Sequence, residues 1–187
     1  MDTAALTQVR LPTVGTWDLD ASHTSVEFLA RHLMVAKVRG RFERFSGAIT
    51  VADPPESSSV EVTIEAASVS SKDEQRDGHL RSADFFDVEQ YPAITFRSTH
   101  VQGAGSAWAV TGDLTMKDVT RPVVLDVEYH GLITDPWGNE KAVFSASTEV
   151  DREDWGLTWN VALEKGGVLV SKKIKLELEV EAPRRAE

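Results

Sequence analysis

The chain has 187 residues, of which 41% are hydrophobic, and 20 basic against 30 acidic residues give it a net charge of −10. This length suffices for one sizeable hydrophobic core, and the excess of acids argues against nucleic acid as a partner. The absence of cysteine excludes disulfides, thiolate catalysis and cysteine-ligated metals. We therefore expect a single domain at 16–182 that follows a flexible arm at 1–15.

No stretch has the character of a secretory signal or a membrane span. The beginning of the chain lacks the apolar core of roughly 7 to 15 residues that a secretory signal contains. No later run approaches the ~18 consecutive apolar residues of a spanning helix. We expect a cytoplasmic protein without a transmembrane segment.

Alternation of apolar and polar residues with a period of two predicts β-strands along most of the chain. An early strand puts Val26, Phe28 and Ala30 on one face, which we expect to point inward. Within 38–51 the parity of the apolar residues switches near Glu43, which predicts a bulge that bends the strand. Strands are expected at 16–20, 23–32, 38–51, 59–66, 93–101, 107–116, 120–133, 142–150 and 168–180.

One segment, 73–90, interrupts this pattern. Leu80, Ala83 and Phe86 recur three apart, which places them on one side of a helical turn and predicts a short helical insertion. Phe85 and Phe86 are adjacent large aromatics, so they must be covered by apolar surface or bind a ligand.

About eight antiparallel strands, most of them joined by short turns, predict an up-and-down barrel rather than a sandwich. A barrel of this size is either filled by its own side chains or holds one slender ligand. Small residues on the predicted inner faces leave room for a tunnel, but they also fit the taper of a solid barrel, so both interiors stay open. These small residues are Ala30, Gly40, Ser98, Gly112, Ala146 and Thr148.

Six motifs in a fixed order carry a family resemblance. They are W-D-L-D-x-x-H-T-x-V-x-F at 17–28, H-L-x-V-x-x-V-x-G-x-F at 32–42, R-D-x-H-L-R-S-x-D-F-F-D at 76–87, Y-P-A-I-T-F-R-S at 91–98, G-D-L-T-M at 112–116 with R-P-V at 121–123, and R-x-D-W-G at 152–156. Together they resemble the YceI-like family. The resemblance implies an extended, lipocalin-like barrel that binds a long polyisoprenoid or related amphiphile, often as a homodimer and often in the periplasm.

Combined with the strand parity, the resemblance implies two sets of ligand-binding residues. The apolar cavity is expected to be lined by Val26, Phe28, Ala30, Phe42, Ile64, Leu80, Phe85, Phe86, Phe96, Leu114, Phe144 and Trp155. The polar mouth is expected to comprise His23, His32, Arg76 and His79. Because 73–90 holds six acids against two arginines, a prenyl quinone or another weakly charged head group is favoured over a diphosphate.

Two chemical functions are weaker candidates. The five histidines show no H-x-H or H-x-x-x-H spacing, so we expect no metal site, and no cofactor motif is present. A cluster of His23, Arg76 and His79 would suit acid-base chemistry on a lipid, but no nucleophile or oxyanion motif accompanies it.

The favoured hypothesis is non-catalytic binding, carriage or storage of a long-chain isoprenoid lipid. The alternatives are an enzyme that uses this cluster, and a structural or partner-binding barrel with a filled interior.

Overall fold

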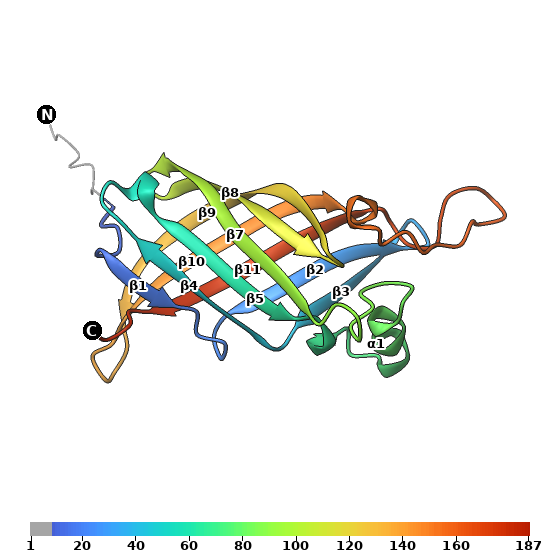
Figure 1. Cartoon of the computed structure of the whole chain (residues 1–187), viewed down its shortest axis with the longest axis horizontal. Coiled ribbons are helices and arrows are strands. Elements are labelled where there is room, and N and C mark those ends of the chain that lie inside the picture. Colours follow the sequence, from blue (N-terminus) through green and yellow to red (C-terminus); the bar gives the residue numbers. More distant parts are fainter. Residues whose placement is uncertain (1–8) are drawn as a thin grey trace, which may run out of the picture.

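The computed structural model describes residues 9–187 and shows the predicted all-β fold, an antiparallel up-and-down barrel of the lipocalin-like kind (Figure 1). The strands are β1 (Gly15–Asp18), β2 (Ser25–His32), β3 (Ala36–Phe42), β4 (Phe45–Val51), β5 (Ser59–Glu65), β6 (Val69–Ser70), β7 (Ala93–Ala104), β8 (Ala107–Met116), β9 (Val119–Thr134), β10 (Glu140–Asp151) and β11 (Lys173–Pro183). The helices are η1 (Pro55–Ser57), η2 (Ala66–Ser68), α1 (Glu74–Arg81) and η3 (Arg152–Trp155).

The strands follow one another round the barrel in the order β1-β4-β5-β7-β8-β9-β10-β11-β2-β3-β6, and every ladder is antiparallel. The last strand pairs with β2, where Leu176 lies opposite Phe28. Residues 9–187 contain eleven strands, more than expected, because β6 was not foreseen and the expected bent strand at 38–51 is divided into β3 and β4.

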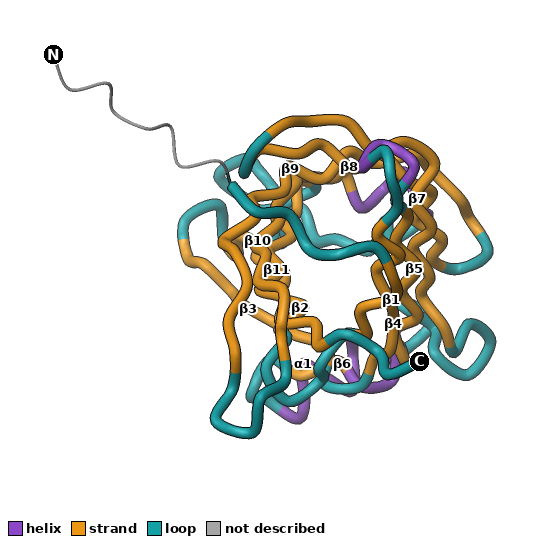
Figure 2. The backbone as a smooth tube through the Cα atoms, turned by 90° about the vertical axis from the view of Figure 1, so that its left-hand side faces the viewer, coloured by secondary structure: helices purple, strands orange, loops and turns teal. Residues whose placement is uncertain are grey.

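No ladder joins β3 to β4, so the barrel has a seam between these two strands in the part of the chain that the structure describes. Glu43 and Arg44 connect them at the point where the sequence predicts a bend. At this end β6 pairs with β3, and the Glu43 N–H donates to the Ser68 carbonyl at 3.1 Å. At the other end β1 meets the end of β11 through a bridge between Trp17 and Arg184. The strands therefore curl round one long axis, as the end-on view shows (Figure 2).

The segment expected to be a flexible arm, 1–15, is described from residue 9 onward. Residues 1–8 lie outside the described residues. In the rest of the segment the Tyr129 hydroxyl donates to the Arg10 carbonyl at 2.9 Å, and the Trp17 indole donates to the Thr13 carbonyl at 3.0 Å. These bonds attach this part to the end of the barrel, and the flexibility of the arm stays a prediction.

The helical insertion is present, but its helix is shorter than the spacing of Leu80, Ala83 and Phe86 suggests. The Asp73 carboxylate accepts a hydrogen bond from the Arg76 N–H at 2.9 Å and caps the first turn of α1. The helix ends at Ser82, whose backbone is extended, so Ala83 and Phe86 lie in the turns that follow. Among the residues described, no helix has the length and apolar character needed to cross a bilayer.

Two glycines on the inner face make room for aromatic rings. A Cβ at Gly40 would overlap the ring of Phe28, which lies opposite it on β2. A Cβ at Gly112 would overlap the ring of Phe96 and come within 2.7 Å of the Arg97 carbonyl oxygen. The space that these glycines leave is filled by neighbouring side chains, so it is not part of a tunnel.

Replacing Gly112 with alanine should therefore lower the free energy of unfolding by about 1 to 3 kcal/mol, because the methyl group meets a backbone carbonyl that cannot move aside easily. Chemical denaturation measures this change. The matched control is Gly78→Ala in α1, where nothing lies within 4 Å of the added methyl group, and it should raise stability by up to about 1 kcal/mol. Equal stability of wild type and Gly112→Ala would contradict the close packing of Phe96 on this glycine.

Candidate functional site

A cavity of about 310 Å³ runs inside the barrel, in the size range of small-molecule sites. Its wall is apolar because every second residue of each strand points inward and those residues are mostly Val, Ile, Leu and Phe. The structure brings eleven of the twelve predicted apolar residues to this wall. They are Val26, Phe28, Ala30, Phe42, Ile64, Leu80, Phe85, Phe86, Phe96, Leu114 and Phe144.

Trp155 is the exception. Its side chain is buried in the packed core, where the indole N–H donates to the Leu114 carbonyl at 2.9 Å, and it does not line the cavity. Its neighbour in sequence, Trp159, lines a second pocket instead. Period-two parity could not place either residue, because Trp155 lies in η3 and Trp159 follows η3 outside any strand.

A buried cation, Arg152, lies at the wall of the main cavity. Its guanidinium donates to the carbonyls of Ser171 at 2.9 Å and Leu157 at 2.6 Å, and it lies 5.9 Å from the centre of the Phe85 ring. Burial lowers the pKa of Arg152 from its ordinary value, against the opposite effect of nearby acids. These bonds fix the segment that follows β10, and no sequence pattern indicated this role.

A second pocket of about 400 Å³ lies beside α1 and is more polar. Phe28, Ala30, Leu80, Phe85 and Val170 line both spaces, so the two lie next to each other. Three of the four residues predicted for the polar mouth meet here: His32, Arg76 and His79. Arg31 also lines this pocket and was not among the predicted residues, because period-two parity puts it on the face opposite to Phe28 and Ala30.

His79 is held in place on several sides. Its ring makes edge contacts with Trp159 at 4.5 Å and with Phe85 at 5.0 Å between ring centres. Its Nε2 lies 2.8 Å from the Asp84 carboxylate. An imidazole packed between two aromatic rings and paired with a carboxylate has a fixed orientation, which suits recognition of a polar group.

The acids of the insertion are largely engaged in local structure. The Asp77 carboxylate is buried and accepts hydrogen bonds from the Ser71 N–H at 2.7 Å and hydroxyl at 2.6 Å. Asp73 caps α1 and Asp84 pairs with His79. Of the six acids in 73–90 only Asp73 lines the second pocket, which also presents two arginines and two histidines. The pocket is therefore basic, contrary to the expectation from local composition.

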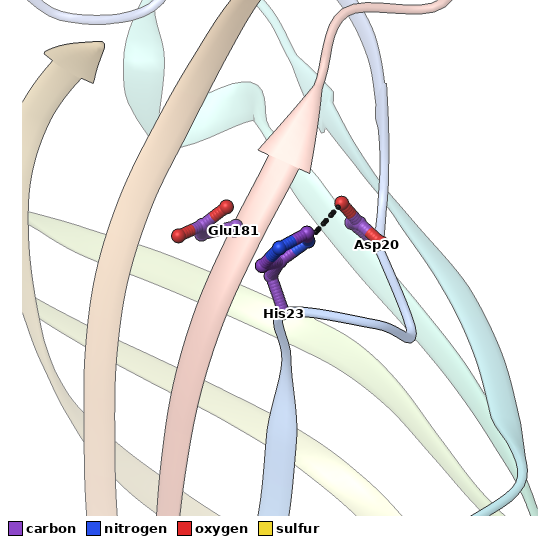
Figure 3. Close-up of side chains that lie close together, drawn as sticks. All are labelled: Asp20, His23 and Glu181. Carbon is purple, nitrogen blue, oxygen red and sulfur yellow. Dashed lines mark hydrogen bonds and ion pairs between the residues drawn. The ribbon is translucent and has the colours of Figure 1, made fainter. Parts of the chain in front are cut away.

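His23 does not join this group, so the cluster of His23, Arg76 and His79 that the sequence suggested is not formed. His23 precedes β2 and His32 ends it, and strands rise about 3.3 Å per residue, which puts roughly 25 to 30 Å between the two backbones. Its imidazole lies 2.9 Å from the Asp20 carboxylate, beside Glu181 (Figure 3). Sequence parity gives the side of a strand but not which end meets the insertion.

Asp20, His23 and Glu181 have the ligand types of a divalent metal site, and their ligand atoms lie within 4.8 Å of one another. The Lys141 ammonium, however, lies 3.2 Å from the Asp20 and 3.4 Å from the Glu181 carboxylate. Burial alone would raise the pKa of Asp20, but hydrogen bonds from His23 and Lys141 outweigh it and lower this pKa. The hydrogen bond to Asp20 raises the pKa of Lys141. The Lys141 ammonium already neutralises charge on these carboxylates. We therefore interpret the three residues and Lys141 as an ion-pair network that connects β10 to β11.

Comparison with known proteins agrees with this geometry. A family model described as the YceI-like domain matches residues 17–182. UPF0312 protein SAS2572 of Staphylococcus aureus (strain MSSA476) is 38% identical over 165 residues, which cover 87% of this chain and 94% of that protein.

Solved structures share the fold. The YceI protein of Campylobacter jejuni is 31% identical with a TM-score of 0.72, over 83% of this chain and 90% of that one. BcnA of Burkholderia cenocepacia is 21% identical with a TM-score of 0.73, over 88% and 99% of the two chains. A polyisoprenoid-binding domain from Saccharophagus degradans is 15% identical with a TM-score of 0.69, over 92% and 100%. The chain belongs to the YceI-like family.

Proposed function

We propose that this protein binds, carries or stores a long-chain isoprenoid lipid without chemical change, with the tail in the main cavity and the head group in the second pocket. The observation that carries this proposal is the apolar cavity along the barrel, which adjoins a basic pocket. A similar fold in a protein described as a polyisoprenoid-binding domain supports the same ligand class.

The apolar wall accounts for binding of the tail. Each buried methylene contributes about 0.8 kcal/mol relative to water, so a prenyl chain needs no polar contact to enter such a cavity. The lipid comes from a membrane, where its tail is already in an apolar environment. The net free energy gained on binding is therefore far smaller than the transfer from water suggests. Polar contacts at the head then decide which lipid is bound.

The basic pocket accounts for the head group. Arg31, His32, Arg76 and His79 line it together with one acid, Asp73, which lies 3.7 Å from the Arg76 guanidinium, so hydrogen-bond donors predominate and the two arginines outnumber the single acid. Such a set suits acidic oxygens, because charge-assisted hydrogen bonds are stronger than neutral ones. This supports a prenyl phosphate ahead of the quinone that local composition favoured.

The two alternatives have less support. The hypothesis of a structural barrel with a filled interior is not supported, because this barrel contains a cavity. An enzyme that uses His23 together with Arg76 and His79 does not fit the separation of His23 from the other two. The cytoplasmic location and the homodimer stay predictions.

Blocking the cavity tests the site of the tail. In Ala146→Phe a ring enters the main cavity from its wall, so binding of a polyprenyl phosphate should fall by about tenfold or more while the fold is kept. Titration of the lipid-free protein, followed by intrinsic fluorescence, measures this affinity.

The matched control for the blocked cavity is Ser147→Phe, which adds the same ring at the next position of β10, on the opposite side of the strand. It should bind as wild type does. Wild-type affinity of Ala146→Phe would place the tail elsewhere and would contradict the proposed function.

Removing the donors of the second pocket tests the site of the head. The double variant Arg76→Ala, His79→Ala should still bind a polyprenyl alcohol, but its preference for the phosphate of equal chain length should fall by about an order of magnitude or more. The control is Arg97→Ala, His100→Ala, which removes the same residue types from β7 at exposed positions outside the pocket. If the control and the pocket variant discriminate equally well, the head group is not read in this pocket.

A further inference from the structure

The end of the barrel that carries α1 also carries an exposed apolar surface, which we call the apolar tip. It consists of the β2–β3 turn at 33–35 and the hairpin at 161–169 between η3 and β11. Leu33, Met34 and Val35 are 49%, 55% and 77% exposed, and Val161 is 46% exposed. The hairpin projects farther along the long axis than α1 does (Figure 1).

The two parts of the apolar tip hold each other in place. The Leu33 N–H donates to the Leu169 carbonyl at 2.8 Å, and an isolated bridge joins His32 to Val170. A Cβ at Gly167 would lie 3.2 Å from the Cγ and Sδ of Met34, so the methionine packs over this glycine. The turn and the hairpin therefore form one continuous surface and are not two independent loops.

The backbone of the turn gives no folding reason for its apolar residues. Leu33 and Met34 have φ angles of +52° and +65° in a turn closed by the Val35 N–H and the His32 carbonyl at 3.2 Å. Two consecutive positive φ angles favour Asn or Gly, and large side chains there raise the energy of the turn. Large apolar residues that are both exposed and unfavourable in conformation point to a function in binding.

The apolar tip borders the mouth of the second pocket. Arg31 and His32, next to the turn, and Leu169 and Val170, at the end of the hairpin, all line that pocket. A lipid that enters or leaves through this mouth passes the exposed side chains of the tip.

Charge distinguishes the apolar tip and the residues beside it from the rest of the molecule. The segments 31–37 and 161–170 contain the cations Arg31, Lys37 and Lys165 and one acid, Glu164, whereas the whole chain has a net charge of −10. Cations beside a small, convex apolar surface match a phospholipid interface, where apolar side chains enter the acyl boundary and cations meet the phosphates.

We propose that the apolar tip docks on a phospholipid bilayer that contains anionic lipid, so that the bound lipid passes between the bilayer and the second pocket. This inference rests on the proposed function and adds the surface from which the lipid is taken. Because the hairpin projects beyond α1, the tip can reach the bilayer while the acidic insertion stays in solvent.

The test is cosedimentation of the full chain with vesicles made of equal parts phosphatidylcholine and phosphatidylglycerol. The variant Leu33→Asn, Met34→Gly places Asn-Gly in a turn whose φ angles favour it, so the variant should be at least as stable as wild type. Its affinity for the vesicles should nevertheless fall by about tenfold or more, because the apolar side chains are gone.

The matched control is Trp137→Ala. Trp137 is 84% exposed in the turn between β9 and β10, toward the opposite end of the barrel, and its removal should leave vesicle binding unchanged. Equal vesicle binding by wild type and the Asn-Gly variant, loss of binding in Trp137→Ala alone, or no binding by wild type would each overturn the docking proposal.

A parallel titration with polyprenyl phosphate in the absence of vesicles separates this inference from the proposed function. The Asn-Gly variant should bind the lipid as wild type does, since the cavity residues are untouched. If wild type binds the lipid but not the vesicles, only the docking inference fails. If wild type binds vesicles but no lipid, the docking surface stands and the proposed function fails.

Discussion

An antiparallel sheet curled into a barrel turns every second side chain toward its interior, and the content of that interior depends on the residues at those positions. In this chain the inward positions are occupied mainly by Val, Ile, Leu and Phe, and the outward positions carry much of the charge. The ladder between β11 and β2 joins the two sides of the sheet, so the inward side chains surround one space. These side chains do not fill it, and a cavity of about 310 Å³ is left.

Much of the barrel could be predicted because strand parity is a local property of sequence. It identified Val26, Phe28 and Phe144 as inward residues, and the structure places all three on the cavity wall. Parity says nothing about how side chains on neighbouring strands share space. Gly40 was therefore expected to leave room, although the Phe28 ring occupies that room.

The candidate site was harder to predict because it depends on contacts between distant segments. His23 and His32 belong to one strand region, and only the three-dimensional arrangement shows that His32 alone meets α1. The same limit applies to Trp159, which follows η3 in the sequence and packs against His79 of α1. Local composition was also misleading, since Asp77 is used inside the insertion and does not face the second pocket.

The account divides lipid recognition between two adjoining spaces, an apolar cavity that takes any long tail and a basic pocket that selects the head. This division follows from the cost of burying charge, because unpaired cations would be unfavourable along the apolar interior of the barrel. Arg152 shows what burial requires, since backbone carbonyls surround its guanidinium.

The central claim is that the cavity holds one isoprenoid lipid, and native mass spectrometry of the purified protein, followed by extraction and identification of any bound lipid, tests it most directly. The account predicts a species heavier than the bare chain by the mass of one lipid, and an extract that contains a prenyl lipid with a polar head. The account would be contradicted if the spectra showed only the mass of the bare chain, both after expression in an isoprenoid-rich host and after incubation with polyprenyl phosphate.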